Sequence, residues 1–308
     1  MLPYIGECVH KFNSMSIGKK GIILAGGTGS RLWPLTIVSS KHLLPIFNKP
    51  MIYYPLTTLM LGGVREVLLI ATETEVSRFK KLFGDGHAWG INIQYTVQHK
   101  ATGIAEAFII GASFIDGQSC VLILGDNIFY GVGIGDLLQR AMSRDKGATV
   151  FCHWVKDASR YGVLEFDPTG RPATIEEKPQ YPKSNWAVTG LYVYDASVVD
   201  IAHRLKPSVH GELEVTDVNR AYLERGTLNV ERLGRGFAWF DAGTQYSLLQ
   251  AADFIYTIEE RQGVMIGCPE EVSYRMGFID ASALEQLADT ALNPEYGSYL
   301  RRLVATGV

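Results

Sequence analysis

The sequence has little cysteine and no long apolar run. Its cysteines, Cys8, Cys120, Cys152 and Cys268, have no metal-binding or redox spacing, which suits a reducing cytoplasm. Cys120 and Cys152 lie inside strand-like runs, where we expect buried, reduced thiols. The longest apolar runs, at residues 67–71 and 120–124, have strand length. A membrane-spanning helix needs roughly 20 apolar residues, so we expect no membrane association.

The sequence also lacks a strong charge of either sign. Its formal net charge is -3 and its isoelectric point is near 6.2. A protein that binds nucleic acid or an anionic membrane would carry a basic surface, so we expect neither partner. There is no internal repeat, low-complexity segment or Pro/Gly/Ser-rich linker in the main part of the chain. With 308 residues, 47% of them hydrophobic, the chain can form one large domain with or without an appendage.

What the sequence does contain is a glycine-rich loop at residues 22–46, IILAGGTGSRLWPLTIVSSKHLLPI. Backbone N–H groups of its glycines can face an anion without a Cβ in the way. Arg31 adds a planar fork suited to phosphoryl oxygens, and Lys41 adds a mobile positive charge. These residues indicate a triphosphate-binding loop. The alternative is a glycine turn with a solvated arginine and lysine.

Two common phosphate-binding motifs do not fit this loop. Counting from Gly21, the Walker-type spacing puts a glycine where the motif needs its lysine. The dinucleotide fingerprint beginning at Gly27 needs a third glycine where the chain has Leu32. The loop therefore belongs to another class of phosphate site.

Hydrophobic periodicity predicts an α/β fold with a doubly wound, Rossmann-like sheet. Strand-like runs at 21–24, 67–71, 93–96 and 121–124 alternate with helix-like runs at 51–61, 75–83, 104–112 and 134–142. The second half is richer in strands, at 149–154, 162–166, 187–194 and 229–233. It is followed by helical patterns from residue 247, including 283–291 and 296–304. Ligands of such sheets bind at the carboxyl ends of the strands, where the glycine loop and Asp126 emerge.

Asp126 and Asp241 are candidate metal ligands. Asp126 follows a buried strand, but Asp126-Asn127 also fits ordinary turn chemistry. Asp241 has the same ambiguity. The two are more persuasive together, because Mg²⁺ on a triphosphate takes one or two carboxylates and completes its shell with phosphate oxygens and water.

A series of motifs runs in order from the glycine loop towards the C-terminus. They are GGTGSRLxP (26–34), SKxLLPI (40–46), KPMIYYP (49–55), LGDN (124–127), YGV (161–163), EEKP (176–179), NWAVTGLY (185–192), GELE (211–214) and GRGFAWxDxGT (234–244). The series resembles the sugar-1-phosphate nucleotidylyltransferases, and within them the glucose-1-phosphate thymidylyltransferases. The resemblance covers nearly everything after residue 20.

The resemblance assigns roles to individual residues. It implies the catalytic residues Arg31, Lys41 and Lys178, and the metal pair Asp126 and Asp241. It implies a nucleotide site of Leu24, Gly26, Gly27, Thr28, Gly29, Ser30, Arg31, Gln98 and Gly103. It implies a sugar-phosphate site of Asp126, Gly162, Glu177, Lys178 and Val188. Taken singly, Glu177 and Lys178 also fit a solvated turn before Pro179, and Gly162 and Val188 also fit strand packing.

The resemblance also implies substrates and organisation. The expected reaction joins dTTP and glucose 1-phosphate, with Mg²⁺, into dTDP-glucose and pyrophosphate for deoxysugar biosynthesis such as that of dTDP-rhamnose. A cytoplasmic homotetramer with a feedback ligand at a second nucleotide site is expected. Residues 1–20 are expected to be an N-terminal extension, 21–246 the catalytic domain and 247–308 a helical region at a subunit interface. The alternatives are another nucleotide or sugar phosphate, or a catalytically silent nucleotide-sugar-binding regulator.

Two departures from the family pattern lie beside the expected nucleotide. His42 replaces the usual glutamine after Lys41, and HKATG at 99–103 replaces the usual PSPDG. An imidazole at position 42 that donates to a phosphate would titrate near neutral pH, unlike an amide. The alternative is that His42 packs at the edge of the loop and contacts nothing reactive.

Overall fold

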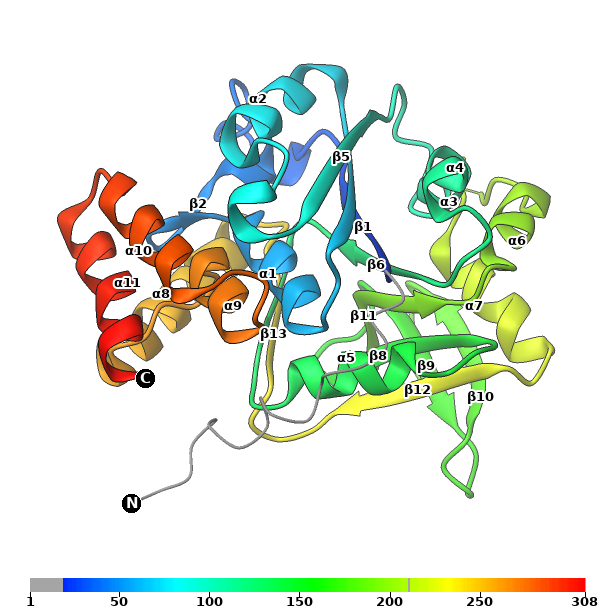
Figure 1. Cartoon of the computed structure of the whole chain (residues 1–308). Helices are drawn as coiled ribbons and strands as arrows, with labels where there is room; N and C mark the ends of the chain where they lie inside the picture. The colour runs from blue at the N-terminus through cyan, green and yellow to red at the C-terminus, as the bar shows by residue number, and fades with distance from the viewer. Residues whose placement is uncertain (1–18, 210, 308) are drawn as a thin grey trace.

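A mixed sheet forms the centre of the structure, a computed structural model that describes residues 19–209 and 211–307. Its strand order is β10-β9-β11-β6-β1-β4-β5, with β8 paired to β11 and β12 paired to β8 (Figure 1). The parallel part consists of β1 (Lys20–Ala25), β4 (Glu66–Ala71), β5 (Asn92–Val97) and β6 (Cys120–Leu124). The rest consists of β8 (Ala148–Trp154), β9 (Gly162–Phe166), β10 (Pro172–Glu177), β11 (Trp186–Tyr194) and β12 (Leu228–Leu233).

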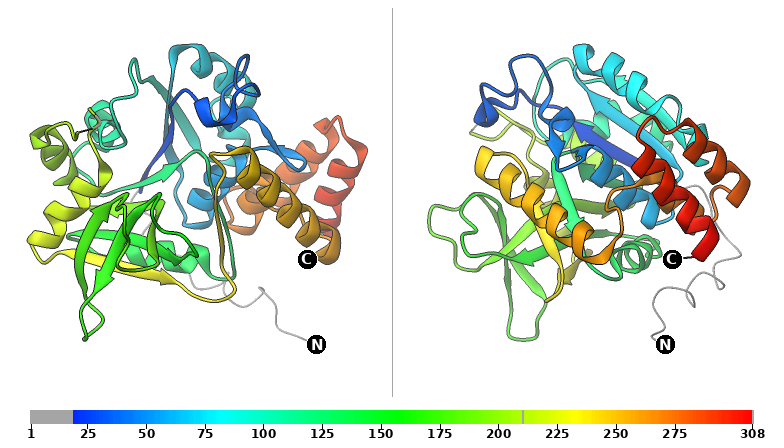
Figure 2. Two further views of the ribbon diagram at one scale, coloured as in Figure 1. Left: turned by 180° about the vertical axis from the view of Figure 1, so that it is seen from behind. Right: turned by 90° about the vertical axis from the view of Figure 1, so that its left-hand side faces the viewer.

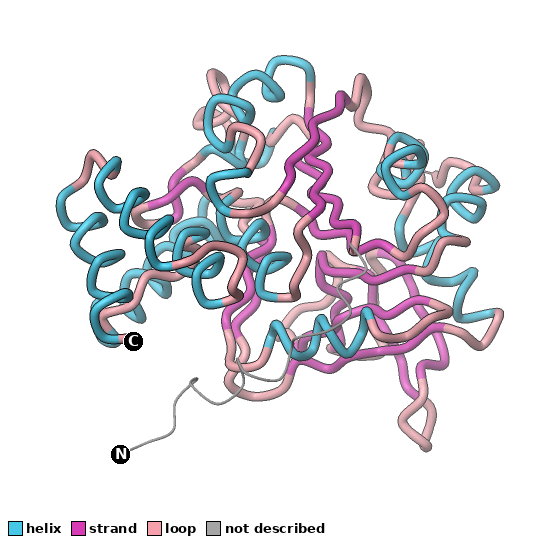
Figure 3. The backbone as a smooth tube through the Cα atoms, in the orientation of Figure 1, coloured by secondary structure: helices cyan, strands magenta, loops and turns pink. Residues whose placement is uncertain are grey.

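Two smaller sheets lie beside the main one. Strand β7 (Asn127–Tyr130) pairs antiparallel with β13 (Ala238–Asp241), and β2 (Pro45–Ile46) pairs antiparallel with β3 (Lys49–Pro50). Figure 3 shows the strands running through the middle of the chain, with helices around them.

Helices cover the sheet, and a further group of helices lies to one side of it. The first half has the 3₁₀ turns η2 (Ser30–Leu32), η3 (Lys41–Leu43) and η4 (His87–Trp89), with α1 (Tyr53–Leu61), α2 (Glu73–Phe83), α3 (Glu106–Ile110), α4 (Ala112–Ile115) and α5 (Ile134–Met142). The second half has α6 (Val198–Arg204), α7 (Val215–Glu224), α8 (Gln245–Gln262), α9 (Pro269–Arg275), α10 (Ala281–Thr290) and α11 (Pro294–Thr306). Helices α8 to α11 lie on the side opposite α6 and α7 (Figure 2).

Alternation along β1 explains why the sheet is covered on both faces. Ile23 packs in a core with Leu56 and Leu59 of α1, whereas Ile22 packs in a second core with Phe108 of α3. Successive side chains of a strand point to opposite faces, so a continuous apolar run needs a layer on each side. Strand β1 is therefore buried on both faces, and the glycine loop that follows it lies at the carboxyl edge of the sheet.

The predicted α/β fold is confirmed, including its strand-rich second half and helical C-terminal part. The helix predicted at 104–112 is divided at Gly111 into α3 and α4. The helical region begins at Gln245, slightly before the predicted residue 247. The sequence pattern does not predict β2, β3, β7, β10 and β13. Strands β2 and β3 have only 2 residues each, and the other three mix polar with apolar residues.

The prediction of buried thiols at Cys120 and Cys152 is confirmed. Cys120, Cys152 and Cys268 are buried and free, and burial raises the pKa of the Cys120 and Cys152 thiols to about 12. Cys8 and the predicted N-terminal extension up to residue 18 lie outside the described residues. Within the described part of the chain, no helix is both long and apolar enough to cross a membrane.

Candidate active site

A cleft of about 330 Å³ lies at the carboxyl ends of β1 and β6 and faces the strand-rich half of the protein. It brings together many of the residues predicted from the sequence, namely Leu24, Gly26, Arg31, Lys41, Asp126, Gly162, Glu177, Lys178, Val188 and Asp241. These come from both halves of the chain, so the fold supplies a single site to which both halves contribute.

The glycine loop leaves β1 and turns directly against Gln98. A Cβ on Gly26 would lie only 2.2 Å from Gln98 Oε1, so no larger residue fits there without moving that side chain. Gln98 is buried, and its Nε2 donates to Glu106 Oε2 at 2.6 Å. The structure therefore holds Gln98 beside the loop, although its side chain does not line the cleft.

The other predicted nucleotide residues lie around this cleft rather than in it. Gly27 and Thr28 line a neighbouring hollow of about 450 Å³, shared with residues 36–40. Gly29, with φ 62°, caps η2, which carries Ser30 and Arg31. Positive φ at Gly27 and Gly29 explains why glycine stands at both positions.

The backbone conformation and close packing at position 103 explain why glycine stands there, which the sequence did not reveal. Its φ is 116°, and a Cβ there would lie 2.4 Å from the backbone oxygen of Leu213. The Leu213 N–H donates to Thr102 O at 2.6 Å, and the Ala105 N–H donates to Leu213 O at 3.0 Å. Glycine at 103 therefore lets the divergent 99–103 loop pack against the backbone of the GELE motif. Its predicted contact with a base stays a prediction.

Lys41 and Asp126 form an ion pair in the cleft. Lys41 Nζ donates to Asp126 Oδ2, and Asn127 Nδ2 donates to Asp126 Oδ1 at 3.0 Å. Burial alone would raise the pKa of Asp126, but the Lys41 charge and these hydrogen bonds outweigh burial and hold the pKa well below its usual range. Asp126 is therefore ionised, and its charge is compensated by Lys41.

Asp241 approaches Asp126 through the pairing of β7 with β13. Asp241 lies opposite Asn127 in that pair, and the Ala242 N–H donates to Asp126 O at 3.0 Å. Burial, and next the charge of Asp126, raise the pKa of Asp241, against the opposing effect of Arg31 and other nearby cations. Asp126 is buried, Asp241 is largely buried, and the two carboxylates repel each other, so a divalent cation could bind between them.

Cationic side chains surround Asp241. Arg160 Nη2 lies 3.8 Å from Asp241 Oδ2. A Cβ on Gly243 would lie 3.0 Å from both Arg31 Nη2 and Asp241 Oδ1, so the guanidinium and the carboxylate flank this glycine. Within residues 19–209 and 211–307, no group of three or more His, Cys, Asp or Glu could hold a metal. A cation between the carboxylates would complete its shell with phosphate oxygens and water.

Glu177 and Lys178 lie on the opposite wall of the cleft. Glu177 ends β10, so the alternative of a solvated turn is wrong for this residue. Its Oε1 lies 3.1 Å from Lys178 Nζ, and Thr216 Oγ1 donates to its Oε2. Burial would lower the pKa of Lys178, but Glu177, Glu214 and Glu212 raise it above its usual value, so the lysine stays charged.

Gly162 and Val188 complete this wall. Gly162 pairs with Glu177 between β9 and β10, and a Cβ there would lie 3.0 Å from Thr216 Oγ1. Glycine at 162 therefore keeps open the space next to the Thr216 hydroxyl and the Glu177 carboxylate.

Of the two alternatives for His42, the structure favours a packed side chain over a titrating imidazole. His42 is only 1% exposed, its Nδ1 lies 2.8 Å from Ser40 Oγ, and a Cβ on Gly125 would lie 2.7 Å from its Cδ2. Burial, and next the charge of Lys41, lower its pKa from 6.5 to about 3. His42 is neutral at physiological pH and forms part of the cleft floor.

Sequence reasoning missed Asn127, which orients Asp126. Asn127 Oδ1 accepts hydrogen bonds from Trp239 Nε1 at 2.6 Å and from the Gly190 N–H at 2.9 Å. Its position next to Asp126, inside the LGDN motif, was a signal that the turn interpretation obscured. Glu212 and Glu214 also line the cleft; they belong to the GELE motif, but no site role is predicted for them. Thr216 and Arg160 line it too and carry no recognisable local signal.

Comparison with known proteins agrees with this geometry. Residues 20–257 match the family described as nucleotidyl transferase. The chain is 55% identical over 289 residues to the glucose-1-phosphate thymidylyltransferase of Xanthomonas campestris pv. campestris, a match that covers 94% of this chain and 98% of that one. It is 52% identical over 285 residues to the enzyme of the same name from Mycobacterium tuberculosis, which covers 92% of this chain and 99% of that one.

Solved structures show the same fold. A crystal structure from Bacillus anthracis, assigned as a glucose-1-phosphate thymidylyltransferase and in complex with sucrose, has a TM-score of 0.72 and 41% identity. It covers 77% of this chain and 94% of that chain. A UDP-glucose pyrophosphorylase complexed with UDP-glucose has a TM-score of 0.68 at 22% identity, covers 78% of this chain and 98% of that one, and shows likeness of fold alone.

Proposed function

Because this chain belongs to the nucleotidyl transferase family, and is more than half identical to glucose-1-phosphate thymidylyltransferases, we propose that it makes dTDP-glucose and pyrophosphate from dTTP and glucose 1-phosphate. The observation that carries the proposal is the meeting of two carboxylates and three cationic side chains in one cleft: Asp126, Asp241, Arg31, Lys41 and Lys178. A site that joins two phosphorylated substrates needs this mixture of charges.

The proposed reaction needs no general base. A phosphate oxygen of glucose 1-phosphate attacks the α-phosphorus of dTTP, a new P–O bond forms, and the bond to pyrophosphate breaks on the opposite side. The attacking phosphate is already largely ionised near neutral pH, because its second pKa is about 6. Catalysis then depends on orientation and on compensation of negative charge.

The cationic residues divide this work by position. In this proposal Arg31, on η2 beside the glycine loop, binds the departing phosphates. Lys178, which contacts Glu177, binds the sugar phosphate, and Glu177 accepts from sugar hydroxyls. Lys41 pairs with Asp126 here, and its ammonium becomes free for the triphosphate once the charge of Asp126 is compensated otherwise.

We propose Mg²⁺ as the cation that Asp126 and Asp241 hold. When bound, it would neutralise charge on the phosphate oxygens. The raised pKa of Asp241 supports this assignment, because the folded protein keeps a second carboxylate in a place that disfavours its charge. A protein that only binds nucleotide sugars does not need two neighbouring carboxylates whose negative charges disfavour each other.

We also propose a cytoplasmic homotetramer with a helical C-terminal region at a subunit interface. Helix α8 carries the exposed apolar side chains Tyr246, Leu249 and Tyr256, at spacings that place them on one face. Light scattering of the Leu249→Glu protein tests this idea, since a charge on that face is expected to lower the mass. A feedback ligand at a second nucleotide site remains part of the proposal.

Pyrophosphate release across a matrix of nucleotides and sugar phosphates tests the function. We expect dTTP with glucose 1-phosphate to give the highest kcat/KM. A higher value for another pair would favour the same chemistry on other substrates. Nucleotide-sugar binding without any pyrophosphate release would favour the silent regulator.

A further inference from the structure

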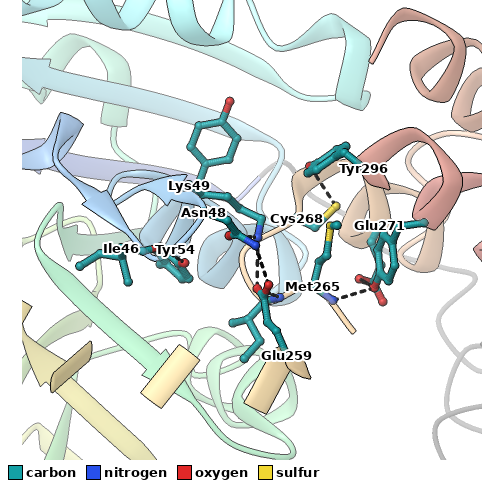
Figure 4. Close-up of polar contacts among 12 residues, drawn as sticks. Ile46, Asn48, Lys49, Tyr54, Glu259, Met265, Cys268, Glu271 and Tyr296 are labelled. Carbon is teal, nitrogen blue, oxygen red and sulfur yellow. Dashed lines mark hydrogen bonds and ion pairs between the residues drawn. The ribbon is translucent and has the colours of Figure 1, made fainter. Parts of the chain in front are cut away.

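A buried ion pair outside the cleft joins strand β3 to helix α8. Lys49 Nζ of β3 lies 3.1 Å from Glu259 Oε1 of α8, and the two side chains are only 4% and 6% exposed (Figure 4). Glu259 Oε1 also accepts from the Ile266 N–H at 2.7 Å, and its Oε2 accepts from Asn48 Nδ2 at 2.7 Å. Glu259 is therefore bonded both to the β2–β3 hairpin and to the chain that follows α8.

Stability alone is a weak explanation for this pair. The free energy needed to desolvate two buried charges offsets much of their electrostatic attraction. Apolar replacements of similar volume are often neutral or stabilising. Such a pair does fix the relative positions of the segments that carry it. Here those segments are the β2–β3 hairpin and the last turn of α8. The Tyr54 hydroxyl holds the other hairpin strand by donating to Ile46 O at 2.8 Å.

The hairpin is continuous with the turn that carries Lys41. The Met51 N–H donates to Leu44 O at 2.9 Å, and the Ile52 N–H donates to His42 O at 3.0 Å. These bonds extend the hairpin back to η3. A displacement of Lys49 would therefore be transmitted through the backbone to the residue next to Lys41.

The same unit supports Asp126. A Cβ on Gly125 would lie 2.7 Å from His42 Cδ2 and 3.2 Å from Ile52 Cδ1, so the turn before Asp126 rests closely on both side chains. At the other end of α8, Thr244 caps the helix through reciprocal hydrogen bonds with Ser247, shortly after Asp241. Helix α8 thus runs from the vicinity of Asp241 to Lys49.

We propose that Lys49 and Glu259 are positioning residues for nucleotidyl transfer, which hold Lys41 in register with Asp126 and, through α8, with Asp241. This inference rests on the proposed function. Neither side chain lines the cleft, so their effect passes through the hairpin and the helix.

The test compares kcat of the Glu259→Gln and Lys49→Met proteins with that of the wild type, on the full chain. A misplacement of about 1 Å can cost roughly a hundredfold in rate, so we expect each variant to lose about tenfold to a hundredfold in kcat. The KM for glucose 1-phosphate should stay within about twofold, because the Glu177 wall is not joined to this hairpin. A kcat within about twofold of wild type in both variants would overturn the proposal.

The Lys49→Met/Glu259→Gln double variant tests whether the two residues act through one contact. Residues that share one interaction give non-additive effects, so the double variant should be no slower than the slower single variant. It also removes both buried charges together, which favours folding if a single variant fails to fold. If the fold losses in kcat of the two single variants multiplied in the double variant, the two residues would act independently and the shared role would be contradicted.

Glu231 provides a matched control. Its side chain is also nearly buried, 11% exposed against 6% for Glu259, and it binds Arg140 of α5 and Arg144 shortly after that helix, away from the cleft. Glu231→Gln should lower the melting temperature without lowering kcat. An equal loss of kcat in Glu231→Gln and Glu259→Gln would assign both effects to general destabilisation and overturn the proposal.

Amide hydrogen exchange gives a readout that does not depend on activity. Glu259→Gln should accelerate exchange at Met51 and Ile52, whose N–H groups hold the hairpin to Leu44 and His42, whereas Glu231→Gln should not. Unchanged exchange at both amides would overturn the positioning role. If the wild-type protein released no pyrophosphate, the proposed function would fail. The exchange experiment would still test separately whether the Lys49–Glu259 ion pair holds the hairpin in place.

Discussion

Lys41 and Asp126, 85 positions apart in the sequence, are paired inside the cleft. The pair explains how a carboxylate can stay ionised at a buried strand end before any substrate arrives. It also brings together two residues with separate predicted roles, Lys41 for phosphate binding and Asp126 for metal binding. In the proposed function, binding of substrate and cation would rearrange the Lys41–Asp126 contact.

The first prediction concerns Asp126. Asp126→Asn keeps the size of the side chain but removes the charge that would bind the cation, so turnover should fall by at least about a hundredfold, as on loss of one preorganised charge contact. Steady-state pyrophosphate release measures it, and circular dichroism checks that the variant is folded. A folded Asp126→Asn protein with wild-type turnover would remove Asp126 from the metal site.

The second prediction concerns the stability of the cation-free protein. The pKa of Asp241 is raised by burial and by Asp126, so the folded state binds this proton more tightly than the unfolded state does. Stability is therefore lost as pH rises from the ordinary aspartate value through the raised one. At neutral pH in EDTA, Asp241→Asn should melt at a higher temperature than the wild type.

The same variant should lose the stabilisation that Mg²⁺ gives the wild type, because one of the two carboxylates no longer carries charge. Thermal melts with EDTA and with Mg²⁺ measure both effects. A lower melting temperature in EDTA, or an unchanged response to Mg²⁺, would argue against the shared cation site.

The third prediction concerns Arg31. Pyrophosphate gains charge as it leaves, so Arg31 should act on the chemical step, and Arg31→Lys should lower kcat because the planar fork is lost while the charge remains. Comparison of kcat and the dTTP KM separates the possibilities. An unchanged kcat with only a raised KM would show that Arg31 merely binds the triphosphate.

The fourth prediction concerns His42. With a pKa near 3, the imidazole is neutral between about pH 6 and 8, so His42→Gln should leave the pH dependence of the dTTP KM unchanged. A flatter profile in the variant would instead assign the titration to His42.

His42 should still affect acid stability. Its folded pKa lies below its ordinary value of 6.5, so the unfolded state binds more protons in the interval down to about pH 3. Stability is therefore lost as pH falls through that interval, and His42→Gln should reduce the loss. Chemical denaturation at several pH values measures it.

The parallel strands could be predicted from the sequence because their signal is local. Strands β1, β4 and β6 are nearly continuous apolar runs, and helix α5 has a clear amphipathic pattern. Strands β7 and β13 are only 4 residues long, and their pairing joins segments more than a hundred positions apart. No periodicity could reveal that this pairing brings Asp241 to Asp126.

The candidate site was predictable mainly where residues belong to motifs. Arg31, Asp126 and Glu177 were placed correctly at the cleft, although their roles are still predictions. The burial of His42 depends on Gly125, which follows a different strand, so local sequence gave no sign of it. The bond from Lys49 to Glu259, 210 positions away, has no local signature either.

Product identification tests the central claim most directly. The purified protein is incubated with dTTP, glucose 1-phosphate and Mg²⁺, and the products are identified by mass spectrometry and phosphorus NMR. The proposed function predicts dTDP-glucose and pyrophosphate in equal amounts, with formation lost when either substrate is omitted and strongly reduced in Asp126→Asn. Absence of dTDP-glucose from the folded wild-type protein under these conditions would contradict it.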